Sequence, residues 1–268
     1  MFRRASTLTA LQPSDRTVKI SFCTTCFRRG TQLAQTICSN AAVIAANSDV
    51  EWIILGYSDD METKSLVSKN IASFSRRITY VHDERSRPWH LSTAKNLAHR
   101  LATGRILMNL DCDNYIGNGH SVIRAAFAMG HKIVHQWSGV HGDGTCGRIA
   151  IARDIYYMLG GYDEALEPMG YQDVDLLNRA FACGISPLHA HCDSSLAIPN
   201  SKLESVRHVD TNGRLWAELN QASKDRSSRN IARGELVANT SKVVDDEVFA
   251  LYYGSQQDIP GVPHLLSS

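Results

Sequence analysis

The sequence lacks an excess of charge of either sign, and this absence excludes several classes of protein. Its 268 residues contain 28 Lys and Arg against 27 Asp and Glu, which leaves a formal net charge of +1. Proteins that bind nucleic acid or anionic membranes through their overall charge need a larger positive balance. We therefore expect no nucleic-acid partner, and any anion must be bound by a local group of basic residues.

The sequence also lacks long apolar runs and a dense set of cysteines. The longest wholly apolar stretch, Ala41–Ala46, is far shorter than the ~20 residues that span a bilayer. Seven scattered cysteines are unlike the even, closely spaced sets of small secreted scaffolds. We expect a cytoplasmic protein with no integral membrane segment. Residues 1–16 are expected to form a flexible leader, with a targeting segment as the alternative because Met1–Ser14 has two arginines and no acid.

From Val18 onward, short apolar runs alternate with segments of helical periodicity. Strands are predicted at residues 18–24, 52–56, 78–81 and 106–110, and helices are predicted between them. This alternation predicts an α/β protein with a single doubly wound, mixed and mostly parallel sheet flanked by helices. Ligands bind at the carboxyl ends of such strands. The loops 24–29, 56–60 and 111–114 are therefore the predicted site loops.

Some further predictions concern individual elements. Thr93 is expected to cap the helix that follows it. Beyond residue 115 we predict helices at 119–129 and 173–183 and strands at 132–136 and 149–152, with the second helix turning Leu176, Leu177, Ala180 and Phe181 inward.

Two acidic segments attract attention. Asp111 and Asp113 follow an apolar strand, where paired carboxylates can bind one divalent cation, although acidic turns without a function show the same pattern. Asp173 opens a predicted helix after the glycines at 160, 161 and 170. The helix dipole favours an ionised carboxylate there, which suits a base, and helix capping is the alternative.

The order of these segments resembles the glycosyltransferases of the GT-A fold, close in pattern to family 2 enzymes and to the C-terminal half of the β-1,4-galactosyltransferases. The resemblance runs from about Val18 to Asp210. It is carried by Thr25-Cys26-Phe27-Arg28-Arg29, Ala94-Lys95-Asn96-Leu97-Ala98, Asp111-Cys112-Asp113, Gly160-Gly161-Tyr162-Asp163-Glu164, Asp173-Val174-Asp175 and Val206-Arg207-His208.

The resemblance implies a role for each matched residue. Asp113 and His208 would bind Mn²⁺ or Mg²⁺, and Asp111 would bind the metal or the donor ribose. Asp173 would be the catalytic base. The nucleotide-sugar donor would contact Thr25, Arg29, Lys95, Asn96 and either Asp59 or Asp60, and the acceptor would contact Tyr171, Asp175 and Trp137. His189 and His191 are the rival candidates for the late metal ligand.

The sequence thus predicts a metal-dependent, inverting glycosyltransferase that uses a nucleotide diphosphate sugar, with UDP-hexose or UDP-N-acetylhexosamine as the expected donor. The acceptor would be a carbohydrate, a peptide or a lipid-linked molecule. Residues 17–115 would form the donor half of one domain, 116–212 its acceptor and catalytic half, and 213–268 a C-terminal helical segment and tail. Gln172 and Val174 replace acids of the galactosyltransferases, which affects the expected acceptor specificity.

Two other functions remain open at this point. A sugar nucleotidyltransferase shares a nucleotide-binding sheet, but it would be expected to have a Gly-rich loop after the first strand, which Thr24–Gly30 lacks. A non-catalytic carbohydrate-binding protein would have no need of a base.

Three other motifs are weaker. The glycines of Gly142–Gly147 precede a strand instead of a helix, so we expect a flexible acceptor-side loop. Cys23 and Cys26 are expected to be buried thiols. The basic stretch Lys224–Arg233 is expected to be a solvated face, with anion binding as the alternative.

Overall fold

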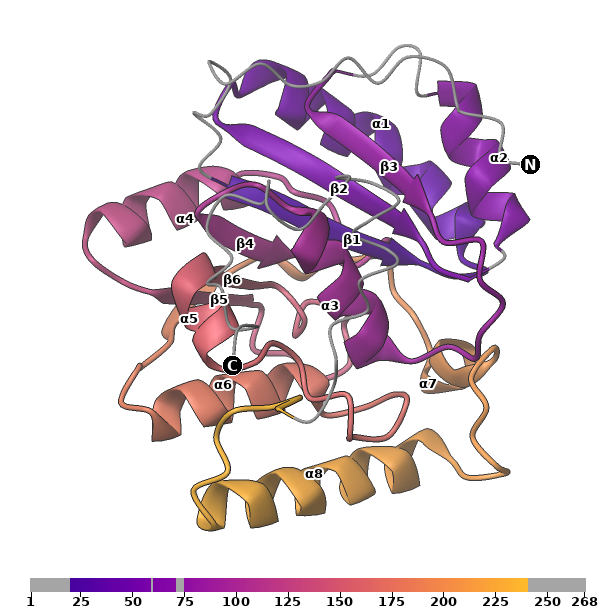
Figure 1. The fold of residues 1–268 in the computed structure, drawn as a ribbon. Helices are drawn as coiled ribbons and strands as arrows, with labels where there is room; N and C mark the ends of the chain where they lie inside the picture. The colour runs from indigo at the N-terminus through magenta and orange to yellow at the C-terminus, as the bar shows by residue number, and fades with distance from the viewer. Residues whose placement is uncertain (1–19, 59, 71–74, 241–268) are drawn as a thin grey trace, which may run out of the picture.

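The computed structural model describes residues 20–58, 60–70 and 75–240, and it arranges them as one sheet between layers of helices (Figure 1). The predicted leader, Asp59 and the end of the C-terminal tail lie outside these described residues. Within the described ranges, no helix combines the length and the apolar character needed to cross a bilayer.

The sheet has seven strands in the order β3-β2-β1-β4-β6-β5-β7. Their bounds are β1 (Ile20–Cys26), β2 (Val50–Gly56), β3 (Ile78–His82), β4 (Ile106–Asn109), β5 (Ile133–Trp137), β6 (Ile149–Ala152) and β7 (Leu188–His191). Among these strands, β6 alone runs antiparallel to its neighbours. The carboxyl ends of the other six therefore meet at one edge, where β6 begins.

Residues along the central strands alternate between two hydrophobic cores, one on each face of the sheet. In β2, Trp52 and Ile54 belong to one core and Ile53 and Leu55 to the other. A strand covered on both faces must be apolar at successive positions, which explains the unbroken apolar runs of the sequence. The predicted mixed, mostly parallel sheet is confirmed.

Two groups of helices cover the two faces. The helices α1 (Gly30–Ala46), α2 (Met61–Asn70) and α4 (Gly119–Ala128) contribute apolar side chains to the first core. The helices α3 (Leu91–Leu101), α5 (Arg153–Met158) and α6 (Gln172–Ala182) contribute to the second. Between β7 and the last helix, the chain forms a 3-10 turn (Ser194–Leu196) and the short helix α7 (Lys202–Val206).

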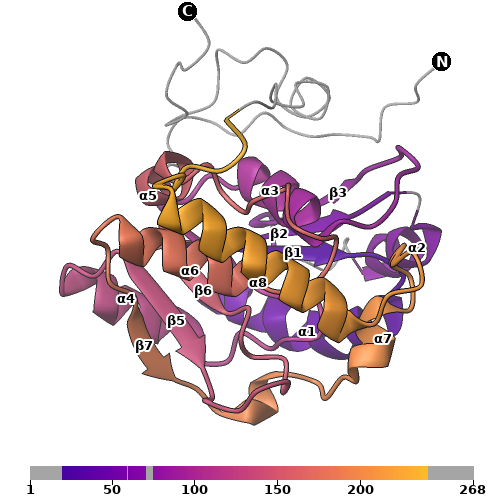
Figure 2. The ribbon, with the colours of Figure 1, turned by 90° about the horizontal axis from the view of Figure 1, so that it is seen from below.

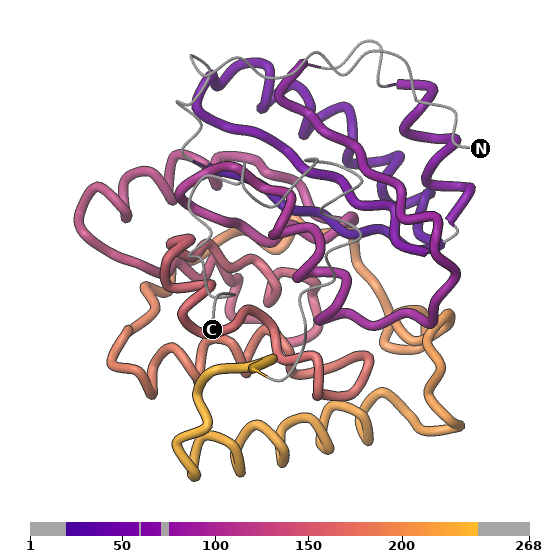
Figure 3. Tube along the Cα trace, in the orientation of Figure 1, coloured from indigo at the N-terminus to yellow at the C-terminus, as the bar shows by residue number. Residues whose placement is uncertain are grey.

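The last helix, α8 (Trp216–Ala232), lies outside α6 and packs against it (Figures 1 and 2). Its inward stripe consists of Leu219, Ser223 and Ser227, each at most 1% exposed. These residues recur every four positions, so they share one face of the helix. The tube in Figure 3 shows how the chain passes from α6 through β7 and α7 before it reaches α8.

Several details of the elements differ from the sequence predictions. The first strand begins at Ile20 and continues to Cys26, two residues beyond its predicted end. Thr93 does not cap α3, because the His90 ring accepts the hydrogen bond from the Thr93 amide at 3.5 Å. Phe181, predicted to face inward, is 66% exposed, because α6 turns its apolar face to the sheet through Leu176 and Ala180. The short helices α5 and α7 escaped prediction because they span too few residues for a periodic pattern.

Candidate active site

The candidate site lies where β1 and β4 end, β6 begins and α6 starts. Asp111 and Asp113 follow β4, and Gly147 precedes β6. Asp173 belongs to the first turn of α6. The structure brings these two acidic segments together, because Lys95 contacts both Asp111 and Asp173 and a Cβ at Gly147 would lie beside both carboxylates.

Buried polar residues of α1 hold the loop after β4 in place. The Thr36 hydroxyl donates to the Cys112 carbonyl at 2.8 Å, and the Asn40 amide donates to the Asn114 carbonyl at 2.9 Å. The Asn40 side-chain oxygen accepts from the Ile116 amide at 2.8 Å. Since these groups are buried, losing either partner would leave an unsatisfied polar atom, so these hydrogen bonds stabilise the loop in this conformation.

Lys95 joins the two acidic segments. Its Nζ donates to Asp173 Oδ1 at 2.7 Å and lies 3.7 Å from Asp111 Oδ1. The Lys95 side chain is 0% exposed. Burial alone would lower the pKa of Lys95, but the charges of Asp111 and Asp173 outweigh it and raise that pKa, so the ammonium group is retained.

The free oxygens of the two carboxylates both approach Gly147. A Cβ atom at this position would lie 2.7 Å from Asp111 Oδ2 and 3.4 Å from Asp173 Oδ2. Asn109 holds Asp111 beside Gly147, because its amide donates to Asp111 Oδ1 at 3.0 Å and to the Gly147 carbonyl at 2.8 Å. Glycine thus leaves open the space between the two aspartates.

Asp113 is bound more tightly than Asp111. Arg29 Nη2 donates to Asp113 Oδ2 at 3.0 Å, and the Asn114 amide donates to Asp113 Oδ1 at 2.9 Å. Burial raises the pKa of Asp113, and the nearby Asp111 carboxylate raises it further. A positive charge between the two aspartates would relieve this repulsion.

The predicted metal ligand His208 lies apart from the carboxylates. It lines a cavity of about 370 Å³ together with Arg28, Arg29 and Arg207, beside the Arg29–Asp113 pair. Slight burial and the neighbouring arginines lower the pKa of His208, which favours the neutral imidazole. Within the described residues, no three His, Cys, Asp or Glu side chains form a group that could hold a metal. His208 is thus not assembled with Asp111 and Asp113.

Three predicted contact residues form hydrogen bonds or ion pairs within the protein. Asp60 caps α2, since its carboxylate accepts from the Thr63 amide at 3.1 Å and from the Thr63 hydroxyl at 2.6 Å. Asn96 is 3% exposed, and its amide donates to the Tyr162 carbonyl at 2.8 Å. Asp175 is 1% exposed and ion-paired with Arg179 at 2.8 Å. The donor contacts of Asp60 and Asn96 and the acceptor contact of Asp175 stay predictions, and the structure shows the protein partners that these three side chains have.

The remaining predicted residues lie around the same edge. Thr25 is buried near the end of β1. Trp137 ends β5, and its ring stacks on the buried His135 with the centroids 5.8 Å apart. Tyr171 precedes α6 with a left-handed backbone, φ 71°, and its hydroxyl accepts from the Asn178 amide at 3.3 Å. No described contact tests whether Trp137 or Tyr171 binds an acceptor.

One of the two rival histidines, His189, contacts another histidine of the sheet. His189 on β7 lies with its Nδ1 3.3 Å from His135 Nδ1, while the other ring nitrogen of His135 lies 2.8 Å from the Cys146 carbonyl. The carbonyl can only accept, so His135 carries its proton on Nε2. His189 therefore belongs to a histidine pair beside the Gly142–Gly147 loop.

Two groups of site residues escaped sequence prediction. Phe27, Tyr57 and Trp89 form an aromatic cluster at the ends of β1 and β2, with the Phe27 and Trp89 rings stacked at 5.7 Å. Arg148 is 1% exposed and donates to the Tyr115 carbonyl at 2.7 Å and to Asn114 Oδ1 at 3.3 Å. These partners are distant along the chain, so no local pattern pointed to them.

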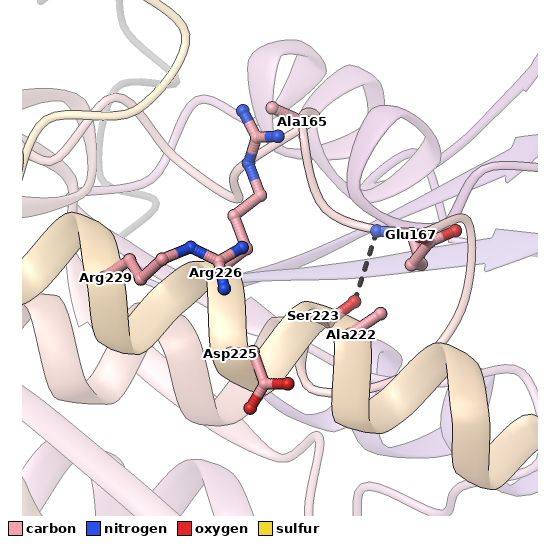
Figure 4. A pocket seen from close by; sticks show the side chains of 7 residues that line it. All are labelled: Ala165, Glu167, Ala222, Ser223, Asp225, Arg226 and Arg229. Atoms are coloured by element: carbon pink, nitrogen blue, oxygen red, sulfur yellow. Dashed lines mark hydrogen bonds between the residues drawn. The ribbon is translucent and has the colours of Figure 1, made fainter.

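The basic stretch Lys224–Arg233 covers the second half of α8 and its C-cap. Its residues are not among the partners described above for Asp111, Asp113 and Asp173. Lys224, Arg226, Arg229 and Arg233 are exposed, which agrees with the predicted solvated face. Arg226 and Arg229 line a pocket of about 310 Å³ with Glu167 and Asp225 (Figure 4). This pocket shares no lining residue with the cavity of His208.

All seven cysteines are free thiols, and Cys23 and Cys26 are buried as predicted.

The sequence matches no protein-family model and no curated protein. Solved structures do share the fold. The mannosyltransferase PcManGT from Pyrobaculum calidifontis, in complex with GDP-Man and Mn²⁺, aligns with a TM-score of 0.54 at 13% identity, over 89% of this chain and 83% of that one. S. aureus TarS 1-349 aligns with a TM-score of 0.52 at 12% identity, over 87% and 78% of the two chains.

A longer S. aureus TarS structure aligns with a TM-score of 0.58 at 12% identity, and the match covers 88% of this chain but 43% of that one. At these identities the likeness establishes the fold. Together with the mixed seven-stranded sheet, it assigns the chain to the GT-A fold that the sequence motifs predicted.

Proposed function

We propose that the protein transfers a sugar from a nucleotide diphosphate sugar to an acceptor hydroxyl with inversion at the anomeric carbon. The observation that carries this proposal is the pairing of Asp173 with Asp111 through Lys95, with both free Oδ2 atoms approaching Gly147. A base and a cation-binding carboxylate are thereby held a short distance apart at the ligand-binding edge of the sheet.

Asp173 is the proposed base. Its Oδ1 is occupied by Lys95, so its Oδ2 is the atom available to accept a proton. As the acceptor oxygen attacks the anomeric carbon, its O–H bond breaks and the proton passes to Asp173 Oδ2, while the bond between the sugar and the diphosphate breaks. One displacement of this kind inverts the anomeric centre.

The carboxylates of Asp111 and Asp113 suit a divalent cation, Mn²⁺ or Mg²⁺, because both supply hard oxygen ligands and they stand at i and i+2 directly after β4. Such a cation would neutralise negative charge on the diphosphate leaving group. It would have to compete with Arg29 for Asp113 Oδ2. A displaced Arg29 would remain in the basic cavity with Arg28 and Arg207, where it can bind a diphosphate.

Two classes of nucleotide sugar, GDP-sugars and UDP-sugars, are candidate donors. The Pyrobaculum calidifontis mannosyltransferase was solved with GDP-Man and Mn²⁺, whereas the motif resemblance favours UDP. Both belong in the same experiment.

The test is a thermal-shift screen of UDP-sugars and GDP-mannose with and without Mn²⁺. A donor at 100 times its Kd stabilises the folded protein by about 2.7 kcal/mol, so we expect a clear rise in Tm that depends on Mn²⁺ for at least one nucleotide sugar. Asp113→Ala should abolish the Mn²⁺-dependent part. Asp225→Ala, on the exposed face of α8, is the matched control and should keep it. A screen without any Mn²⁺-dependent shift would contradict the proposal.

A further inference from the structure

We propose that Lys95 is a positioning residue that fixes the orientation of the proposed base, Asp173, relative to the proposed cation-binding carboxylate, Asp111. By holding Oδ1 of both Asp173 and Asp111, it directs Oδ2 of each toward the reacting groups. This inference rests on the proposed function, because it assigns Asp173 the role of the base. The family resemblance implies a donor contact for Lys95, and the role proposed here differs from that expectation.

The first argument is burial. An ammonium group that is removed from water needs charged or hydrogen-bonding partners, since an unpaired buried charge is very costly. Lys95 is 0% exposed, and in the part of the chain that the structure describes its ion pairs are formed with Asp111 and Asp173. Its Nζ also lies 5.1 Å from the centre of the Tyr162 ring. A diphosphate would have to displace these carboxylates to reach it.

The second argument is a contrast with the neighbouring ion pair of α6. Arg179 pairs with Asp175 and also donates to the carbonyls of Leu159 and Gly161, so it ties α6 to the segment after α5. Lys95 holds two carboxylates that remain partly exposed, Asp111 at 34% and Asp173 at 18%. Lys95 therefore orients two carboxylates that a ligand can reach, whereas Arg179 orients one that is closed off from solvent.

The third argument is the convergence on Gly147. Both Oδ1 atoms face one ammonium group, and both Oδ2 atoms lie within reach of a Cβ built on the facing glycine. The separation of the free oxygens is therefore set by Lys95 and bounded by Gly147. Fixed geometry between a base and the groups on the leaving side is what a single displacement requires.

Removing the charge of Lys95 has two opposite consequences. Asp173 loses the group that orients it, so turnover falls. Asp111 loses a nearby positive charge that repels a divalent cation, so Mn²⁺ binds more tightly. Unfolding or a general loosening of the site would lower both turnover and Mn²⁺ affinity. The two readouts therefore separate positioning from a purely structural role.

The experiment is a double-mutant cycle with Lys95→Met and Asp173→Asn, using the donor found in the screen. For Lys95→Met we expect turnover to fall by about 10-fold or more, the KM for the donor to stay within about 3-fold, and the Kd for Mn²⁺ to fall by about 3-fold. In the Asp173→Asn background the same substitution should change turnover by less than about 2-fold, because Lys95 acts through Asp173. Lys95→Arg, which keeps the charge, should recover part of the activity.

Lys64→Met is the matched control, because Lys64 is a surface lysine paired with Glu84 at 3.4 Å, and it should leave all readouts unchanged. If Lys95→Met does not fold, Lys95→Gln completes the cycle. Additive losses in the two backgrounds, or weaker Mn²⁺ binding with a folded Lys95 variant, overturn the role of Lys95 while the proposed function stands. A wild-type protein that is inactive with every donor overturns the proposed function and this inference together.

Discussion

The first turn of α6 carries two aspartates with opposite fates. Asp173 is 18% exposed and pairs with Lys95, which comes from α3 on a distant part of the chain. Asp175 is 1% exposed and pairs with Arg179 one turn further along the same helix. At 3.6 residues per turn, positions two apart point to nearly opposite sides of a helix. One aspartate therefore faces the site and the other faces the interior.

Residue type and sequence motif alone therefore do not define the role of either aspartate. Both aspartates lie within a matched acidic motif, and both were assigned to the site. What distinguishes them is the partner. Arg179 fixes Asp175 to backbone carbonyls within the core, whereas Lys95 connects Asp173 to a second carboxylate at the sheet edge. We therefore expect substitutions of Asp175 to change stability and substitutions of Asp173 to change turnover.

The largest effect on stability is expected for Asp175→Asn. Breaking one partner of a buried ion pair leaves an uncompensated charge on Arg179, and such losses are about 3 kcal/mol or more. Urea unfolding should detect this decrease, while donor affinity of the folded variant stays unchanged. The control Asp225→Asn, on the exposed face of α8, should shift the free energy of unfolding by less than about 0.5 kcal/mol. Equal stabilities of the two variants would break the comparison.

A smaller effect is expected from acidification, through the helix that carries Lys95. His99 lies one turn after Lys95, stacks on Tyr156 at 4.9 Å, and has its Nδ1 2.7 Å from the Lys95 carbonyl. Burial lowers the pKa of His99 to about 3. The unfolded chain binds this proton near pH ~6.5 and the folded chain does not, so stability falls as the pH drops below that value.

The expected loss from His99 is about 2 kcal/mol between pH 6.5 and pH 5. It can be measured as the difference between the unfolding free energies of the wild type and His99→Phe across this range, because carboxylates contribute equally to both. The difference should grow in favour of the variant as the pH falls. A difference that is independent of pH would show that His99 has the same pKa in the folded and the unfolded protein, which would contradict the lowering of that pKa by burial.

The fold was largely predictable because it depends on local patterns. Continuous apolar runs identified β2 and β4, whose residues are buried on both faces of the sheet. The topology rule then placed Asp111 and Asp113 at the correct edge. The first strand extends two residues beyond its predicted end because Thr24 and Thr25, though polar, are buried within it: the Thr24 hydroxyl donates to the Leu110 carbonyl at 2.7 Å.

The site was less predictable because its geometry depends on pairs that are distant along the chain. No local feature of Lys95 shows that it binds Asp173, seventy-eight positions later. The same limitation applies to Asn96, whose side-chain oxygen accepts from the Tyr156 hydroxyl at 2.6 Å. The family motifs predict a donor contact for both residues, whereas the contacts of Lys95 with two carboxylates and of Asn96 with Tyr156 and Tyr162 follow only from the three-dimensional structure.

The most direct test of the central claim is the rate at which the protein releases nucleoside diphosphate from its donor, compared between wild type and Asp173→Asn. Both proteins are first shown to be folded and to bind the donor with Mn²⁺. We predict that the wild type turns over and that Asp173→Asn loses at least ~100-fold in rate, the scale of a positioned base, while its donor Kd stays within about 3-fold. Release by Asp173→Asn at the wild-type rate would contradict the assignment of Asp173 as the base.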